Sequence, residues 1–327
     1  MFTYILRRLL RMVPTLFAIS IMVFVIIQLP PGDFFDSLQA QLAESDSQAD
    51  QEAFDALRQQ YHLDEPLWKQ YLYWIGGCLV GDFGYSFEWR RPVSELIAER
   101  LGLTFLMASG ALIFMWLVAL PIGIYSARNR YSFGDYFLTF LAFIGLCVPG
   151  FVVALVAMYI SVFWFGGSAG GLFSPDLKYA PWNLAKVWDL LKHLWVPVVV
   201  IGAAGTASLM RIMRTSMLDV LDEQYITTAR AKGLAERWVI YKYAVRVAIN
   251  PMISILGLQM PQLVSGSIIV AIVLGLPTTG PLFYRALETQ DMYLAGTFLM
   301  LLATLLLLGN LIADILLAWA DPRIRLD

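Results

Sequence analysis

Residues 211–234 read RIMRTSMLDVLDEQYITTARAKGL, a charged stretch that separates two long apolar blocks. Helix-favouring residues run up to Gly233, and glycine often stands just beyond a helix C-terminus, where the backbone needs a positive φ. Arg230 and Lys232 lie at the same end, where the helix dipole favours cations. Residues 236–247 predict a second helix that leads into the next apolar block. We therefore expect a short helix, a sharp turn and a second helix lying across the membrane face.

Long blocks without Asp, Glu, Lys or Arg lie on both sides of this stretch. They are Met12–Gly32, Leu101–Ala127, Tyr136–Pro175, His193–Met210, Val247–Tyr284 and Met292–Ala313. The chain of 327 residues is 59% hydrophobic and 15% charged, whereas about 25% of residues in soluble domains are charged. A membrane-spanning helix needs about 20 apolar residues, and each block reaches or approaches that length. The pattern predicts an all-α polytopic membrane protein with six transmembrane helices.

Two of the blocks are longer than one span needs. Glycine pairs at 166–167 and 170–171 interrupt Tyr136–Pro175, and the stretch GLPTTGP at 275–281 interrupts Val247–Tyr284. Backbone exposed to lipid must be hydrogen-bonded internally, which such segments cannot achieve. Each block therefore predicts one span followed by a loop, and the first of these spans should cover about residues 136–161.

The first block follows Arg7, Arg8 and Arg11, as the apolar region of a signal peptide would. It continues to Leu29 and ends at Pro30-Pro31-Gly32-Asp33 without a small-x-small cleavage site. Because the apolar block ends without a cleavage site, we expect it to be an uncleaved first span and not a signal peptide.

The distribution of basic residues predicts the orientation. Segments 1–13, 127–134, 211–246 and 321–327 hold 14 of the 23 Lys and Arg residues. Basic residues concentrate on the cytoplasmic side, so we expect both termini to be cytoplasmic. The predicted domains are then the N-terminus and first span (1–29), an extracytoplasmic insertion (30–100), a five-span core (101–320, with the cytoplasmic loop 211–246) and a cytoplasmic tail (321–327).

The insertion 30–100 is too polar for lipid, since 13 acidic and 4 basic residues lie between Pro30 and Glu99. Apolar residues from Phe54 to Tyr61 and from Leu67 to Ile75 show helical spacing, which predicts two amphipathic helices broken near Pro66. The stretch Ala40–Ala53 is polar, and we expect it to be mobile. The insertion should form a small helical subdomain.

Residues for catalysis, metal binding or nucleotide binding form no recognisable pattern. The chain lacks a GxxxxGK[ST] phosphate loop, HExxH and GxSxG. Cys78 and Cys147 lie far apart, and His62 and His193 are isolated, so we expect neither a metal nor a redox site. We also expect no enzymatic activity and no cofactor on this chain.

The predicted spans contain few ionisable groups. Asp314 is the exception, and we expect it to pair with a base at the inner end of a span, Arg8 or Arg323. Ion-coupled carriers place charged groups near mid-membrane, and here the polar residues in that region are neutral. The energy for transport must therefore come from a partner, unless the protein is a passive pore.

The run from Tyr225 to Leu234 resembles the EAA-type coupling loop of ABC importer permeases, in particular the peptide-type group. The similarity extends to Tyr4–Leu10, Pro14–Leu16, Pro31–Asp33, Gly81–Ser86, Arg91–Val93 and Asp321–Arg325. The chain departs from the pattern at Thr227 and Thr228, which replace the Glu and the first Ala of the loop, and at the segment Arg100–Phe105.

The resemblance implies a type I ABC importer permease fold in a bacterial cytoplasmic (inner) membrane. It also implies several partners: the lipid bilayer, a second homologous permease in a heterodimer, two cytoplasmic ATPase subunits that carry Mg-ATP and an extracytoplasmic substrate-binding protein. No nucleic acid is expected. The residues implied to couple to the ATPases are Tyr225, Thr228, Ala229, Arg230, Lys232, Gly233 and Leu234. Gly233 would permit the turn, Ala229 would fit the ATPase groove, and Arg230 and Lys232 would reach acidic residues there.

Polar residues of the fifth span are candidates for the translocation path, namely Gln259, Gln262, Ser265 and Ser267. Gln259 and Gln262 are three residues apart and share a helix face. They could equally hydrogen-bond to neighbouring helices. In the outer loop Pro277–Asp291, the charged residues Arg285, Glu288 and Asp291 are candidates for docking the binding protein.

A path without fixed charge favours a zwitterionic or neutral polar solute. Short peptides come first, and oligosaccharides or metal chelates remain open. Three rival classes are an ion-coupled secondary transporter, a membrane transferase and a scaffold. The first would need intramembrane charges and an inverted repeat, and the second a cluster of carboxylates or histidines near the interface. The sequence shows none of these features, whereas a scaffold is not excluded by pattern alone.

Overall fold

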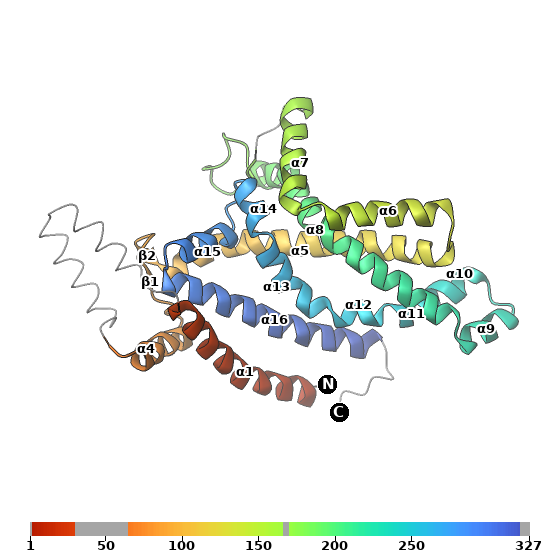
Figure 1. Cartoon of the computed structure of the whole chain (residues 1–327), viewed down its shortest axis with the longest axis horizontal. Helices are drawn as coiled ribbons and strands as arrows, with labels where there is room; N and C mark the ends of the chain where they lie inside the picture. Colours follow the sequence, from red (N-terminus) through yellow and green to blue (C-terminus); the bar gives the residue numbers. More distant parts are fainter. Residues whose placement is uncertain (1, 30–64, 166–169, 321–327) are drawn as a thin grey trace, which may run out of the picture. The chain divides into compact units, whose positions relative to one another are not determined.

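The computed structural model describes residues 2–29, 65–165 and 170–320. In chain order the elements (Figure 1) are α1 (Phe2–Gln28), α4 (Leu67–Val80), β1 (Tyr85–Ser86), β2 (Arg91–Pro92), α5 (Val93–Arg128), α6 (Phe133–Cys147), α7 (Gly150–Phe165), α8 (Leu184–Leu221), α9 (Gln224–Ala231), α10 (Glu236–Trp238), the π-helical segment η1 (Val239–Ala244), α11 (Val245–Ala248), α12 (Asn250–Ser254), α13 (Leu256–Gly266), α14 (Ile268–Val273), α15 (Thr279–Glu288) and α16 (Met292–Ala320).

Long apolar helices dominate this order and confirm the all-α membrane fold. In the described part of the chain, five helices are long and apolar enough to cross a membrane: Tyr4–Gln28, Val93–Arg128, Leu184–Leu221, Leu256–Val273 and Met292–Ala320. A sixth span results if the bent pair α6 and α7 counts as one.

The third predicted span is not the single straight helix that its composition indicated. The helices α6 and α7 meet at an angle of 102°. Val148 has an extended backbone (φ −84°, ψ 121°) and is followed by Pro149. A residue before proline is disfavoured in the helical region, so the helix ends there and restarts at Gly150.

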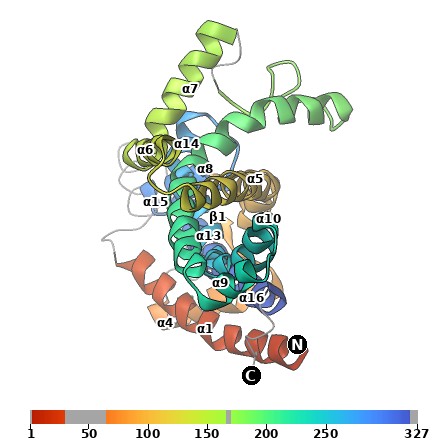
Figure 2. The ribbon, with the colours of Figure 1, turned by 90° about the vertical axis from the view of Figure 1, so that its right-hand side faces the viewer.

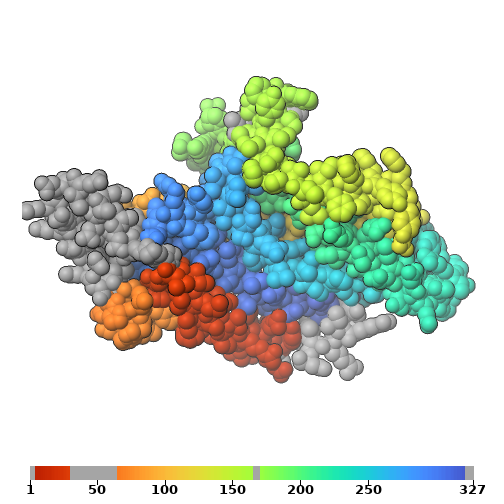
Figure 3. All heavy atoms as spheres, viewed as in Figure 1, coloured from red at the N-terminus to blue at the C-terminus, as the bar shows by residue number. Residues whose placement is uncertain are grey.

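The helices group into two compact units. The first comprises Met1–Arg8, Leu103–Gly280 and Leu305–Asp327, and the second comprises Leu9–Gly102 and Pro281–Thr304. In the first unit α6 runs alongside α8, and α7 and α14 also contact α8 (Figure 2). The space-filling view shows atoms of α6 and α8 adjoining on one face (Figure 3).

Each unit has its own apolar core. In the first, Leu190, Leu194 and Val200 of α8 pack with Val270 and Ala271 of α14. In the second, Val23 and Phe24 of α1 pack with Trp74 of α4 and with Leu294 and Ala295 of α16.

The second helix of the predicted insertion is confirmed as α4, which begins directly after Pro66. Its Trp74 is 4% exposed and lies 6.0 Å, between ring centroids, from Phe24. The predicted helix near 54–61 and the polar stretch 40–53 lie outside the described residues. The helix α5 begins at Val93, so the end of segment 30–100 already belongs to that helix.

The predicted ion pair of Asp314 is confirmed within the first unit. A guanidinium nitrogen of Arg8 lies 2.9 Å from Asp314 Oδ2, and the Tyr4 hydroxyl donates to the same oxygen at 3.0 Å. The pair joins the start of α1 to the last turns of α16 and neutralises the carboxylate at the end of a span. The other expected partner, Arg323, lies outside the described residues.

Candidate functional site

The turn between α9 and α10 has the geometry that the sequence predicted. Gly233 adopts φ +74°, and its N–H donates to the Arg230 carbonyl at 2.9 Å. A Cβ built at this position would meet nothing within 4 Å. Glycine is therefore favoured here by the backbone angle and not by a lack of space. We call residues 224–246 the coupling segment, after the ATPase-coupling role that the resemblance implies for residues 225–234.

A salt bridge closes this turn from the side. Arg230 Nη2 donates to Glu236 Oε1 at 2.8 Å, and its Nε donates to Oε2 at 3.3 Å. The hydrogen bonds raise the pKa of Arg230 and lower the pKa of Glu236. Glu236 pairs with Arg230 within the chain, and both side chains stay a little under half exposed. The expectation that Arg230 reaches an acidic ATPase residue stays a prediction. Lys232 remains an exposed cation on the segment.

The apolar residues of α9 face inward. Ile226 is fully buried and Ala229 is 6% exposed, and α9 packs against η1, whose Val239 is also fully buried. Ala229 therefore presents little surface of its own, and the expectation that it fits an ATPase groove stays a prediction. A small side chain at this position lets α9 approach η1 closely.

The outward face of the coupling segment carries aromatic residues that the sequence reasoning missed. Trp238 and Tyr241 are 53% and 65% exposed, and Tyr225 and Leu234 of the same segment are each 39% exposed. Thr228 is also exposed. The missed signal was the pair Trp238 and Tyr241, two aromatic residues three apart within the stretch 236–247. Exposed aromatic and apolar side chains of this kind often form the centre of a protein interface.

A cavity of about 420 Å³ lies in the first unit, between α8 and the fifth span, which consists of the helices α13 and α14 in succession. Gln259 and Gln262 both line it, together with small or polar residues of α8 such as Ala204, Gly205 and Ser208. Gln259 is 7% exposed and accepts a hydrogen bond from Trp116 Nε1 at 3.1 Å, which fixes its amide. Every residue that lines the cavity is uncharged.

The two predicted serines of the path are not part of this cavity lining. The Ser265 hydroxyl donates to the Pro261 carbonyl, and the Ser267 hydroxyl donates to the Val264 carbonyl, each at 2.9 Å. Both hydroxyls thus satisfy backbone acceptors on their own helical segments. The structure therefore groups Gln259 with Gln262 but places Ser265 and Ser267 elsewhere.

The three charged docking candidates belong to the second unit and differ in accessibility. Arg285 and Glu288 are about half exposed and pair at 2.8 Å, and Glu88 lies 3.7 Å from Arg285. Asp291 is fully buried and accepts a hydrogen bond from the Ser86 hydroxyl at 2.5 Å. We therefore assign Asp291 to the packing of this unit instead of to contact with a binding protein.

The motif Gly81–Ser86 builds the support for Asp291. Gly84 adopts φ +83°, and a Cβ there would collide with the ring of Tyr293. Ser86 follows on β1, which pairs with β2 in the register Ser86 with Arg91. Asp291 Oδ1 in turn accepts the Leu294 N–H at 3.3 Å, so it caps α16. The motif that carried part of the family resemblance thus holds the start of the last span.

Metal binding finds no support in the described ranges 2–29, 65–165 and 170–320, where no three His, Cys, Asp or Glu side chains gather. The arrangement offers an uncharged cavity within a helical bundle and a partly aromatic segment at a helical turn.

Two family models match the chain. Residues 119–326 match the binding-protein-dependent transport system inner membrane component, and residues 1–108 match the N-terminal part of such membrane components.

Relatives align over nearly the full length. The chain is 38% identical over 329 residues to the oligopeptide transport system permease protein AppB of Bacillus subtilis, covering 99% of this chain and all of that protein. It is 35% identical to a putative peptide permease of Brucella ovis and 33% identical to the glutathione transport system permease protein GsiC of Escherichia coli K12, with 99% of each chain covered. The chain belongs to the family of binding-protein-dependent transport system inner membrane components, the permease subunits of ABC importers.

Proposed function

We propose that this permease, together with a second homologous permease, imports short peptides. The observation that carries the substrate class is the uncharged cavity lined by Gln259 and Gln262. Side-chain amides both donate and accept hydrogen bonds, as peptide groups do, and the absence of fixed charge in the lining suits a zwitterionic solute. Relatives named for oligopeptide and glutathione transport support the same class.

The proposed energy source is a pair of cytoplasmic ATPase subunits that bind Mg-ATP. The turn at Gly233, closed by Arg230 and Glu236, gives a rigid segment, and Trp238 and Tyr241 give it an exposed aromatic face. Closure of the ATPases on ATP would displace this segment, and the cavity would thereby open to one side of the membrane and then to the other. This scheme places the coupling segment and both termini in the cytoplasm.

On the opposite side, an extracytoplasmic binding protein would deliver the substrate. Arg285 and Glu288 are the proposed contacts, since both are exposed and lie on α15 directly before the last span. Their charges could meet complementary charges on the binding protein and set its orientation.

Co-purification and reconstituted uptake test the proposal together. The tagged chain, expressed with its neighbouring genes, should co-purify with a second permease and two ATPases. Proteoliposomes of that complex with its binding protein should accumulate short peptides with ATP but not with ADP. A stable homo-oligomer without partners would contradict the assembly. Uptake of an oligosaccharide or a nickel chelate in place of peptides would contradict the substrate class, and uptake driven by a proton gradient without ATP would contradict the energy source.

A further inference from the structure

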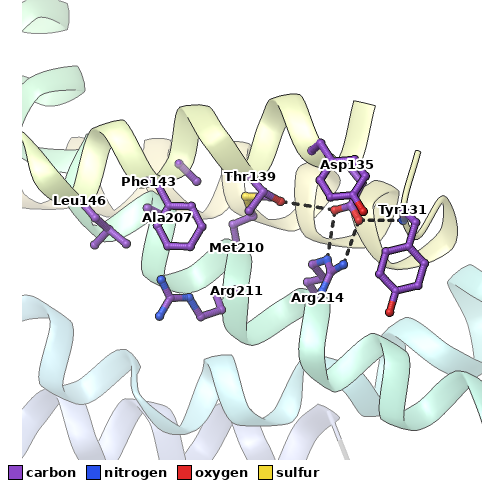
Figure 4. A pocket seen from close by; sticks show the side chains of 11 residues that line it. Tyr131, Asp135, Thr139, Phe143, Leu146, Ala207, Met210, Arg211 and Arg214 are labelled. Carbon is purple, nitrogen blue, oxygen red and sulfur yellow. Dashed lines mark hydrogen bonds and ion pairs between the residues drawn. The ribbon is translucent and has the colours of Figure 1, made fainter. Parts of the chain in front are cut away.

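A second cavity, of about 250 Å³, lies between α6 and α8 of the first unit (Figure 4). It is separate from the proposed path, because its lining shares no residue with the cavity of Gln259 and Gln262. Its walls combine apolar side chains, such as Phe143 and Leu146, with the arginines Arg211 and Arg214. The proposed transport cycle assigns no role to this cavity.

One of the two arginines is neutralised within the chain. Arg214 donates from Nε and Nη2 to the two carboxylate oxygens of Asp135, at 3.1 and 2.9 Å. The same carboxylate accepts the Tyr131 N–H at 3.1 Å and the Thr139 hydroxyl at 3.4 Å. Figure 4 shows these interactions at one end of the cavity. The Asp135 carboxylate and the Arg214 guanidinium therefore compensate each other.

The other arginine keeps its charge available. Arg211 lies one helical turn before Arg214 on α8, and its guanidinium carbon stands 5.3 Å from the centroid of the Phe143 ring. No carboxylate of the described residues lies within 4.0 Å of the Arg211 side chain. The cavity thus has one net positive charge, held over an aromatic face that leaves its hydrogen-bond donors free.

The position of Arg211 along α8 matches a membrane interface. It is the first charged residue after the apolar block 193–210. Phe143 and Leu146 on α6 are 49% and 41% exposed, so the apolar wall opens to the surroundings of the helices. A ligand that fits both features has an anionic head at the arginine and an apolar chain along α6.

We propose that this cavity binds one anionic phospholipid of the surrounding bilayer. The phosphate accepts hydrogen bonds from the Arg211 guanidinium, and an acyl chain lies against Phe143 and Leu146. Basic pockets between spans are known to hold anionic headgroups, and one Arg near the surface contributes about fivefold in affinity. A free phosphate ion would use the arginine but would leave the apolar wall unfilled. The bound lipid would brace α6 against α8, which continues directly toward the coupling segment.

Native mass spectrometry of the purified transporter complex tests the site. The complex, with all co-purifying subunits, is titrated in detergent with phosphatidylglycerol or with phosphatidylcholine of the same chain length. The unsubstituted complex should retain one phosphatidylglycerol in preference to phosphatidylcholine. Arg211→Gln should lower that retention about fivefold, and Arg211→Lys should restore most of it because the charge returns. The matched control is Arg128→Gln, which removes an exposed arginine at the end of α5 outside the cavity and should leave retention unchanged.

A cavity-filling variant distinguishes a lipid that occupies the cavity from a lipid that is held only by the charge of Arg211. Ala142 lines the cavity, and Ala142→Leu reduces its volume while keeping both arginines. Retention should fall with this variant too, while the unfolding temperature measured without added lipid should match that of the unsubstituted complex. Three results would overturn the proposal: equal retention of the two lipids, equal effects of Arg211→Gln and Arg128→Gln, or displacement of phosphatidylglycerol by inorganic phosphate at equal concentration.

Discussion

The guanidinium of Arg230 lies 2.8 Å from the carboxylate of Glu236, on the other side of the turn at Gly233. Both side chains are a little under half exposed, so the pair contributes at most about 1 kcal/mol to stability. Its two hydrogen bonds connect the end of α9 to the start of α10 across the turn. The segment that the resemblance assigned to the ATPases thus pairs two of its own charges.

Replacing Gly233 should separate ATP hydrolysis from transport. Gly233→Pro cannot adopt φ +74°, since proline fixes φ near −65°, and it removes the N–H that bonds to the Arg230 carbonyl. We expect ATPase activity to persist in proteoliposomes while ATP-driven uptake falls at least about tenfold, the factor that corresponds to 1.4 kcal/mol. Normal uptake by this variant would remove the coupling role from the turn.

Two further substitutions at Gly233 identify the cause. Asn tolerates a positive φ and Val does not, and both have room because nothing lies within 4 Å of a Cβ there. Gly233→Asn should therefore transport nearly normally, and Gly233→Val should resemble the proline variant. Equal defects would indicate a contact with the ATPase instead of a backbone requirement.

Exchanging the charges of the salt bridge tests whether its internal pairing matters. Arg230→Glu alone places two carboxylates together and should reduce uptake severalfold. The double variant Arg230→Glu with Glu236→Arg restores the pair and should recover most of the uptake. If the double variant stays as defective as the single one, Arg230 acts through an acidic residue of the ATPase, as the resemblance first implied.

Cysteine labelling distinguishes the residues of the path. In a background with Cys78→Ser and Cys147→Ser, Gln262→Cys should react with a hydrophilic maleimide, and substrate should slow the reaction because Gln262 lines the cavity. Ser265→Cys should show no protection by substrate, since its residue is not in the lining. In the unsubstituted protein, by contrast, Cys78 should react slowly, because burial raises the pKa of its thiol to about 11. Equal protection at 262 and 265 would contradict the assignment of the cavity as the path.

The buried carboxylate of Asp291 should make the stability depend on pH. Burial raises the pKa of Asp291 from 3.8 to about 6, which outweighs its hydrogen bonds from Ser86 and from backbone N–H groups, and the nearby Glu88 acts in the same direction. The folded protein therefore holds this proton more tightly than the unfolded chain. The contribution of Asp291 to the free energy of unfolding is greatest below about pH 4. It falls as the pH rises to about 6 and is constant above that, and the total loss is about 3 kcal/mol.

The Asp291→Asn variant serves as the control for that pH dependence. An amide can still accept from the Leu294 N–H and donate to the Ser86 hydroxyl, so the cap of α16 persists. Between about pH 4 and pH 6, the stability of the variant in thermal unfolding should no longer show the pH dependence that Asp291 causes. At pH 7 the variant should be more stable than the unsubstituted protein. Destabilisation at pH 7 would show that the ionised carboxylate is required.

Removing one partner of the Asp135 and Arg214 pair should be costly. The Asp135 side chain is 3% exposed, so Arg214→Met would leave a buried carboxylate without its cation and should destabilise the protein by about 3–5 kcal/mol. Asp135→Asn combined with Arg214→Met should be less harmful than the sum of the two single changes. A double-mutant cycle in thermal unfolding measures this coupling, and additive effects would contradict it.

Several features follow from local sequence because the physics that decides them is local. Lipid offers no hydrogen bonds to the backbone, so long uncharged blocks must become helices, and the spans could be found from composition. The turn at Gly233 follows from a glycine after a run of helix-forming residues. Pro66 marked the start of α4 in the same way.

Tertiary structure decided the environment of each polar side chain. The sequence presented Asp291 as a loop carboxylate, and only the approach of β1 to the start of α16 buries it against Ser86. The four polar residues of the fifth span were all candidates for the path, yet Gln259 and Gln262 line the cavity, whereas the hydroxyls of Ser265 and Ser267 bond to backbone carbonyls.

The sequence by itself determined that this chain is a helical membrane permease and that a helix ends in a turn at Gly233, because hydropathy and glycine conformation depend on near neighbours. Only the tertiary structure decided which charges are available to partners. Glu236 neutralises Arg230 and Asp135 neutralises Arg214, whereas Arg211 faces an aromatic ring. These pairings depend on distances between side chains that packing alone sets, and periodicity along a helix does not encode them.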